Sequence, residues 1–446
     1  MRDVEKELKQ MTRIFSETPD SAQAAQAIQT GIRKASRQRK IKRRFSCGTF
    51  LAIALIFLAL SSVKISPAFA AYLDRIPGMH PIIVLIEGDK GLEDAIRHHA
   101  LQKINRSKII DHTTLTINSM LADKNQIIFF YTLKNPDKKI SGALKKFSLI
   151  NDRAEPVDGP AEFNYAGMGA DGKGKKHLIH DRISFTLNAA KLTNPMHLSL
   201  KTEEGMFTFS IPFNLSKIKK SEDFYAVHKT FSLQGQKITI QSVAIYPTRT
   251  AIRVTYDRQN SKQITALDDL QLFDQTGEAE TRENGITATS LSPDQHIYYL
   301  QSNYFNKPRT IYLRLTSARA IDKKSRQVVI DIAKKKLLRK PADNRITLQS
   351  IKAVKDGETH RKMLELRFAI KVPKIDSRSL YPIFASYYRD EGGKHEQKSS
   401  DGLEDLLGRT HYELVHLPDK PYKNPVTLTL SDYPSRIKGN IKLKIK

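Results

Sequence analysis

The hydrophobic and polar positions divide the chain into three parts with different patterns. Residues 1–44 repeat with a helical period, Phe45–Val63 is a run of nineteen residues without a charge, and the residues after about 107 alternate at every second position. At a rise of about 1.5 Å per residue, the uncharged run reaches roughly 28 Å, which matches the hydrocarbon core of a bilayer. The pattern predicts a transmembrane helix over 45–63, with a short arm before it and a large outer part after it.

A block of basic residues stands directly before the uncharged run. Its members are Arg33, Lys34, Arg37, Arg39, Lys40, Lys42, Arg43 and Arg44. Basic residues beside a span stay on the cytoplasmic side. We therefore expect a single-pass protein of the cell membrane, with a cytoplasmic N-terminus and an extracellular C-terminal region. The residues that determine this topology are Arg37, Arg39, Lys40, Lys42, Arg43 and Arg44.

A cleaved signal peptide is the other interpretation of the uncharged run. Ala68-Phe69-Ala70 fits the small-x-small pattern of a cleavage site. The 44 residues in front of the run are far more than an ordinary leader carries, and the run itself exceeds the usual apolar region. These lengths favour a retained signal anchor, and cleavage after Ala70 stays open.

The outer part repeats two phrases in the same order three times. A strand-like phrase is followed by a second alternating run, and later an Asn and a Pro lead into another short alternating stretch. The first phrase is Leu115–Met120, Ile238–Val243 and Ile346–Ile351, and the prolines are Pro195, Pro308 and Pro425. The prolines are 113 and 117 residues apart, a unit length typical of an immunoglobulin-like sandwich. Alternation with β-branched residues predicts antiparallel strands with one face buried.

The predicted fold class is a mainly β ectodomain of tandem immunoglobulin-like β-sandwiches on a single transmembrane helix, with a short helical cytoplasmic arm. Each copy closes with a period-2 strand, at Phe207–Ile211, Val328–Ile332 and Ile441–Ile445. The predicted organisation is an arm at 1–44, the span at 45–63, a juxtamembrane segment at 64–106, and sandwiches at 107–217, 218–336 and 337–446.

Charge and cysteine content restrict the environment of the outer part. The formal net charge is +27, of which the arm holds 12 basic and 5 acidic residues, so +20 remains outside. Across a membrane from the genome, direct nucleic-acid binding is not expected, and an anionic envelope polymer or lipid head groups are the possible counter-charges. Plain solubilisation is favoured, because no basic cluster interleaves with aromatic residues along the sequence. Cys47 is the only cysteine, so the outer domains depend on their hydrophobic cores rather than on disulfides.

The sequence contains no complete catalytic or metal-binding motif. Gly169–Lys175 is close to a phosphate-binding loop, but Lys176 stands where a Ser or Thr would reach magnesium. His177, His180 and Asp181 have a possible metal spacing without a further ligand cluster. No nucleophile elbow is present. We expect no enzyme activity, no cofactor and no metal.

The arm carries an apolar stripe. Val4, Leu8, Met11 and Phe15 are spaced for one helical face, and Ile14 widens it. Helices of about 12 residues are marginal alone in water, so this face needs a cover. It is either a clamp for a cytoplasmic protein, or part of a loosely ordered tail whose basic end binds anionic lipid.

The region after the span resembles a known family. The phrases are Ser66-Pro67-Ala68-Phe69-Ala70, Ile76-Pro77-Gly78-Met79, Gly88-Asp89-Lys90-Gly91-Leu92 and Ile104-Asn105-Arg106-Ser107. They resemble a family of single-pass membrane proteins of Gram-positive bacteria whose juxtamembrane domain has no assigned function and often precedes an uncharacterised immunoglobulin-like domain. Members tend to be encoded beside extracytoplasmic-function sigma factors and are treated as anti-sigma proteins. The arm lacks the Cys and His zinc motif of the best-known anti-sigma class.

The resemblance implies a membrane-anchored, anti-sigma-like regulator that couples the outer sandwiches to a cytoplasmic partner, a candidate sigma factor. Val4, Leu8, Met11, Ile14 and Phe15 would then bind that partner. The alternative is a passive cell-surface protein that binds an anionic envelope polymer, with the arm serving only as an anchor. The arm separates the two, because a passive anchor has no need of the apolar stripe.

Overall fold

The chain from Phe69 to Lys446 forms one compact unit. The computed structural model describes residues 80–140, 144–157, 164–165, 176–214, 222–275, 279–280, 287–356, 360–372, 383–396, 398–404, 410–423 and 425–446. The arm, the basic block and the predicted span at 45–63 lie outside these residues. Among the helices that are described, none combines the length and apolar character needed to cross a bilayer. The described part is mainly β, as the alternation predicted.

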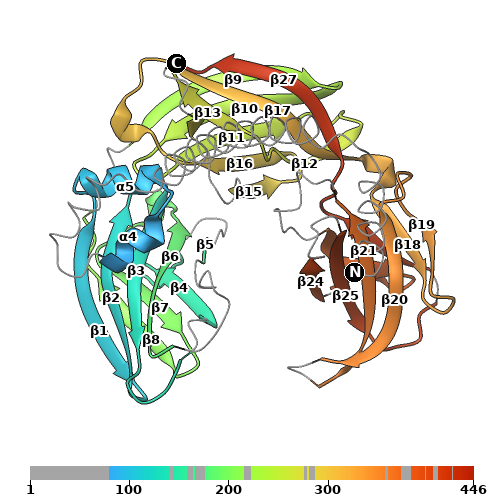
Figure 1. Ribbon diagram of the computed structural model, residues 1–446, viewed down its shortest axis with the longest axis horizontal. Helices are drawn as coiled ribbons and strands as arrows, with labels where there is room; N and C mark the ends of the chain where they lie inside the picture. The colour runs from blue at the N-terminus through green and yellow to red at the C-terminus, as the bar shows by residue number, and fades with distance from the viewer. Residues whose placement is uncertain are drawn as a thin grey trace, which may run out of the picture. The chain divides into compact units, whose positions relative to one another are not determined.

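Two short helices precede the strands (Figure 1). They are α4 (His80–Ile86) and α5 (Lys90–Arg97). Asp89 caps α5, because its Oδ1 accepts a hydrogen bond from the backbone N–H of Leu92 at 3.2 Å. Leu92, Ala95 and Ile96 are buried on one face of α5. The spacing of these apolar residues is that of one face of a helix.

The first sandwich packs two antiparallel sheets around one core that runs from Leu115 to Phe213. Its larger sheet has the order β1-β2-β3-β6-β5, with β1 (Gln102–Ile110), β2 (Thr113–Ala122), β3 (Gln126–Lys134), β6 (Leu178–Thr186) and β5 (Asn164–Tyr165). The smaller sheet has the order β4-β7-β8, with β4 (Lys146–Ile150), β7 (Met196–Lys201) and β8 (Met206–Ile211). A short 3-10 helix, η1 (Ala189–Lys191), precedes β7.

The second sandwich has the same plan. One sheet has the order β15-β16-β11-β10-β9, with β15 (Thr287–Ser292), β16 (Gln295–Leu300), β11 (Thr250–Tyr256), β10 (Gln236–Ile245) and β9 (Asp223–Leu233). The other has the order β12-β17-β13-β14, with β12 (Lys262–Ala266), β17 (Ile311–Asp322), β13 (Gln271–Asp274) and β14 (Ala279–Glu280), and β27 (Arg436–Lys444) also pairs with β17. The 3-10 helix η2 (Tyr304–Asn306) lies between β16 and β17.

The third sandwich follows after the 3-10 helix η3 (Lys323–Ser325). One sheet has the order β19-β18-β26-β22-β23, with β19 (Lys336–Arg339), β18 (Gln327–Asp331), β26 (Val426–Leu430), β22 (Phe384–Asp390) and β23 (Gly393–Glu396). The other has the order β20-β21-β25-β24, with β20 (Ile346–Lys355), β21 (Lys362–Lys371), β25 (Thr410–Pro418) and β24 (Lys398–Glu404).

A β-bulge recurs at the same place in all three copies of the first phrase. The register shifts between Ile117 and Ser119 in β2, between Ile240 and Ser242 in β10, and between Leu348 and Ser350 in β20. The extra residues are Asn118, Gln241 and Gln349, so each copy places one amide residue at its bulge. Bulges are specific features of a strand, and their coincidence shows that the three phrases are structurally equivalent.

The closing strands of the second and third copies are exchanged. In the first sandwich the closing strand β8 pairs with β7. The strand at the β8 position beside β17 is β27, the last strand of the chain (Figure 1), and the strand beside β26 is β18, which follows β17 in the sequence. Ile437 accordingly packs in the second core, while Val328 and Ile330 pack in the third. The structure therefore departs from the expected units 218–336 and 337–446, because each contributes its closing strand to the other.

Candidate functional site at the junction of α5 and the first two sandwiches

Helix α5 contacts the second sandwich through the segment that follows β16. The Gln301 side chain donates from Nε2 to the carbonyl oxygen of Gly88 at 2.7 Å and accepts from the backbone N–H of Lys90 at 3.3 Å. A Cβ on Gly91 would lie 2.7 Å from the backbone nitrogen of Ser302. Glycine is therefore required at position 91 for this close approach. These contacts fix the N-terminal turn of α5 against the second sandwich.

A buried aspartate joins the first and second sandwiches. Asp123, in the turn between β2 and β3, is fully buried. Its Oδ1 accepts from the backbone N–H groups of Asn125 at 2.8 Å and Gln126 at 2.9 Å, and its Oδ2 accepts from the N–H of Thr248 at 2.9 Å and from the Thr248 hydroxyl. Burial raises the pKa of the Asp123 carboxyl, and these hydrogen bonds oppose the rise. The carboxylate thus connects two turns from different sandwiches.

Arg249 makes the second link between the same turns. It stands in the turn between β10 and β11 and is only 1% exposed. Its guanidinium donates from Nη2 to the Thr186 hydroxyl at 2.8 Å and from Nε to the side-chain oxygen of Asn125. The same group lies 3.7 Å from the centre of the Tyr299 ring. Asn125 and Thr186 are neutral partners of this buried charge. The Tyr299 ring, which belongs to the second sandwich, adds a cation–aromatic contact to it.

A cavity of about 740 Å³ opens beside these links. Its lining mixes polar and apolar side chains: His98, His99, Ala100, Leu101, Gln102, Met120, Ala122, Asn214, Pro247, Tyr304 and Phe305. The imidazole of His98, at the end of α5, stacks on Phe305 with ring centres 4.3 Å apart. The cavity is lined by residues of both sandwiches and of the end of α5, so it belongs to the same junction.

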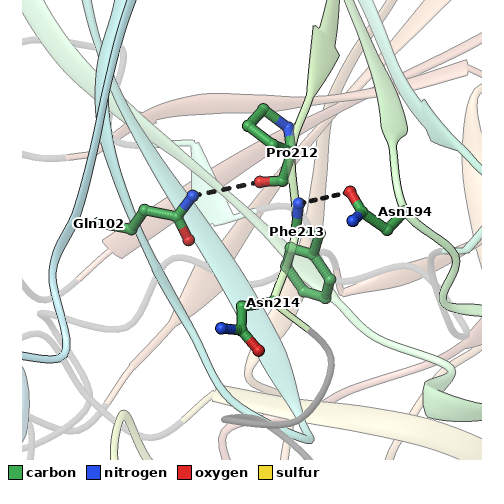
Figure 2. A pocket seen from close by; sticks show the side chains of 5 residues that line it. All are labelled: Gln102, Asn194, Pro212, Phe213 and Asn214. Carbon is green, nitrogen blue, oxygen red and sulfur yellow. Dashed lines mark hydrogen bonds between the residues drawn. The ribbon is translucent and has the colours of Figure 1, made fainter.

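A second, smaller cavity of about 370 Å³ shares Gln102 and Asn214 with the first. Figure 2 shows the amide side chains of Gln102, Asn194 and Asn214 around Pro212 and Phe213. Gln102 donates to the carbonyl oxygen of Pro212 at 3.2 Å, and Asn194 accepts from the N–H of Phe213 at 2.9 Å. These amides already serve to fix the end of β8, so this cavity is a structural edge of the first sandwich.

Some of the residues predicted as sites lie outside the described residues, and the others make ordinary hydrogen bonds. Val4, Leu8, Met11, Ile14 and Phe15, and the basic residues Arg37 to Arg44, lie outside the described residues. His180 contacts the Thr132 hydroxyl at 2.9 Å, His177 contacts the Asn135 carbonyl at 3.1 Å, and Asp181 accepts from the Tyr131 hydroxyl at 3.4 Å. Within the described ranges, no three His, Cys, Asp or Glu side chains gather in a metal-binding arrangement.

The junction itself was not predicted from the sequence. Asp123, Thr248 and Arg249 stand in polar turns, which sequence reasoning assigns to the solvent. The available signals were Gly91, within the phrase Gly-Asp-Lys-Gly, and the presence of an arginine between two threonines. Neither indicates that two turns more than a hundred residues apart lie against each other.

Comparison with known families divides the junction between two of them. Residues 40–135 match a domain of unknown function, DUF4179, and residues 222–351 match a family of unknown function, DUF5643. Helix α5, Asp123 and Asn125 lie in the first match, and Thr248, Arg249 and Gln301 lie in the second. No curated protein matches the chain significantly. Among solved structures, one similar chain is the conserved domain protein from Bacillus anthracis, with 11% identity, a TM-score of 0.38, and coverage of 54% of this chain and 84% of that one.

Proposed function

We propose that the protein is a membrane-anchored regulator, in which an extracytoplasmic β-sandwich region is coupled to a cytoplasmic partner, an extracytoplasmic-function sigma factor. The observation that carries the proposal is the junction. Helix α5 lies between the predicted span and the sandwiches in the sequence, and Gln301 and Ser302 hold it against the second sandwich. A passive anchor needs only a tether at this position. A regulator needs a connection through which a change in the sandwiches reaches the span.

The chemistry of the junction supports this role. Asp123 and Arg249 are both buried and both bind groups on the opposite sandwich. Such contacts are sensitive to small displacements, since a buried polar group that loses its partner destabilises the fold by about 1–3 kcal/mol. An open arrangement of the junction would lose these contacts, and a ligand or partner that binds the closed and the open arrangement with different affinity would shift their populations.

The partner-binding end of the proposal rests on the stripe of Val4, Leu8, Met11, Ile14 and Phe15, together with the resemblance described above. Full burial of a Leu or Phe side chain contributes roughly 1.5–3 kcal/mol. Replacing Leu8 and Phe15 together by Asp should thus weaken a stripe-driven complex by about 100-fold or more. The measurement is co-purification of cytoplasmic proteins with the full-length chain, together with transcription from the promoter that the bound sigma factor reads.

The matched control places the same charges away from the stripe. Gln10→Asp with Ser16→Asp adds two carboxylates to the arm and leaves the apolar residues in place. We expect loss of the partner and raised transcription only in the Leu8 and Phe15 double variant. Retention of the same partners by both double variants would leave the passive cell-surface anchor as the better account.

A further inference from the structure

Five side chains form a cation–aromatic face on the second sandwich. The register of β13, β17 and β27 places them in two neighbouring rows across the sheet: Phe273 beside Tyr312 and Lys444, and Arg314 beside Lys442. They occupy the alternate positions to Leu272, Leu313 and Leu443, which pack on the core of this sandwich. The five residues therefore point away from that core.

The aromatic and basic groups of this face are in contact. The rings of Phe273 and Tyr312 are stacked with centres 5.5 Å apart and planes inclined by 21°. The Lys442 ammonium lies 4.7 Å from the centre of the Tyr312 ring and 5.2 Å from that of Phe273. The sequence does not reveal this interleaving, because the residues come from three strands. Along the sequence no basic cluster interleaves with aromatic residues, and the interleaving arises only from the pairing of the strands.

The cations of the face are not neutralised. In the described part of the chain, Arg314, Lys442 and Lys444 make no ion pair with an acidic side chain. The nearby carboxylate of Asp269 is engaged by the Thr316 backbone and hydroxyl and by Ser317. Arg314 and Lys442 are also direct cross-strand partners. Like charges directly opposite one another destabilise a sheet, so an anion between them would relieve a repulsion that the fold leaves in place.

The form of the face indicates an extended ligand rather than a lipid surface. Its cations are spread over neighbouring strands, and the partly exposed rings beside the Lys442 ammonium add apolar surface that the C–H groups of a polyol or sugar can contact. The exposed large apolar side chains of the described residues are Val84, Ile109, Leu178, Met206, Phe224, Leu291 and Leu338. None of them is on β13, β17 or β27, and Phe273 and Tyr312 are only partly exposed, so the face presents little apolar surface for insertion into a bilayer.

We infer that the cation–aromatic face binds an anionic envelope polymer in which phosphodiester groups alternate with polyol or sugar units. Arg314, Lys442 and Lys444 contact the phosphates, and Tyr312 and Phe273 contact the intervening units. This binding does not depend on the arm or on the regulator proposed above, although it would give that regulator its external ligand.

The test uses the full-length chain in detergent and a fluorescent glycerol-phosphate oligomer, with binding followed by fluorescence anisotropy at several salt concentrations. Arg314→Gln with Lys442→Gln is expected to weaken binding at least tenfold. The slope of log affinity against log salt should also fall by about 1.4, the value for two lost phosphate contacts on a flexible polyanion. Circular dichroism verifies that the variant is folded.

The matched control is Lys352→Gln with Lys355→Gln, which removes two exposed lysines from β20. It should change affinity less than threefold. A Tyr312→Ser variant should bind the glycerol-phosphate oligomer more weakly and inorganic polyphosphate as well as before, because only the former has units for the ring to contact. The inference would be overturned if the Lys352 and Lys355 double variant lost as much affinity as the Arg314 and Lys442 double variant. Tighter binding to phosphatidylglycerol vesicles than to the oligomer would overturn it as well.

Discussion

Replacing Arg249 by Met should loosen the connection between the first two sandwiches without unfolding either. Methionine keeps much of the length and apolar stem of the side chain and removes its charge and donors. Three hydrogen bonds to the first sandwich disappear: one to the Thr186 hydroxyl at 2.8 Å, one to the side-chain oxygen of Asn125 and one to the Asn125 carbonyl oxygen at 3.4 Å. The contact of the guanidinium with the Tyr299 ring at 3.7 Å is lost as well. Thr186, which is buried, and Asn125, which is partly buried, are left without these partners.

The size of the effect follows from opposing contributions. Each hydrogen bond to a charged donor contributes about 1.5–3 kcal/mol, and a desolvated cation–aromatic contact contributes about 2 kcal/mol. Against this, a buried guanidinium loses its hydration, and the methionine variant no longer bears that loss. We expect a net loss of about 2–4 kcal/mol from the junction.

Hydrogen exchange of the full-length chain in detergent measures this locally. A loss of 2 kcal/mol corresponds to about 30-fold faster exchange through local opening. The faster exchange should appear in peptides that cover the turns after β2 and β10, and strands β20 and β21 should exchange as before. Arg253→Met is the control, since Arg253 is an exposed arginine on β11. If the two variants showed the same exchange at the junction, Arg249 would not hold the sandwiches together.

Two further predictions concern buried groups in single sandwiches. Burial raises the pKa of Asp181 from 3.8 to about 6, so the folded chain retains a proton between these pH values that the unfolded chain releases, and this group's contribution to stability falls as the pH rises through that window. Asp181→Asn should therefore raise the unfolding free energy by about 1–3 kcal/mol at pH 7.5 and leave it nearly unchanged at pH 4, measured by denaturant titration at both pH values; a gain at both would contradict this assignment. Ile437→Ala should destabilise the second sandwich by about 2–5 kcal/mol, with faster exchange in β9–β12 and unchanged exchange in β20–β25, whereas the exposed control Lys438→Ala should do neither. Faster exchange confined to the third sandwich would refute the placement of β27.

Alternation along the sequence predicted the strands of each copy. A break in that alternation also marks each bulge, although the bulges were not predicted. In β2, Leu115 and Ile117 are buried at odd positions, and the next buried apolar residue is Met120 at an even one. In β10, Ile238 and Ile240 are followed in the same way by Val243. A change of parity inside a continuous strand requires one extra residue if both groups are to face the same core.

Other features could not be predicted because they depend on contacts between distant segments. The strands Val328–Ile332 and Ile441–Ile445 have equivalent alternation, and either could close either sandwich as far as local pattern is concerned. The burial of Asp123 and Arg249 results from two polar turns meeting, and the cation–aromatic face results from the register of three strands. In each case the residue types are visible in the sequence, while the pairing that gives them a role is not.

The exchange of closing strands links the second and third sandwiches, which keep separate cores, although the family match at 222–351 ends within β20. The chain passes from the second sandwich to the third through η3 and returns just before β27. A buried charge network stands at the return: Arg319 on β17 pairs with Asp268 at 3.0 Å and with Asp432 at 3.2 Å, and Arg436 pairs with Asp268 at 2.8 Å. Asp432 ends the third sandwich and Arg436 begins β27, so the network fixes both ends of the return.

A ligand on β27 or β17 binds a sheet that lies in the second sandwich but contains strands from both the second and the third copy of the repeat. Through Thr248, Arg249 and Gln301, that sandwich is connected in turn to the first sandwich and to α5.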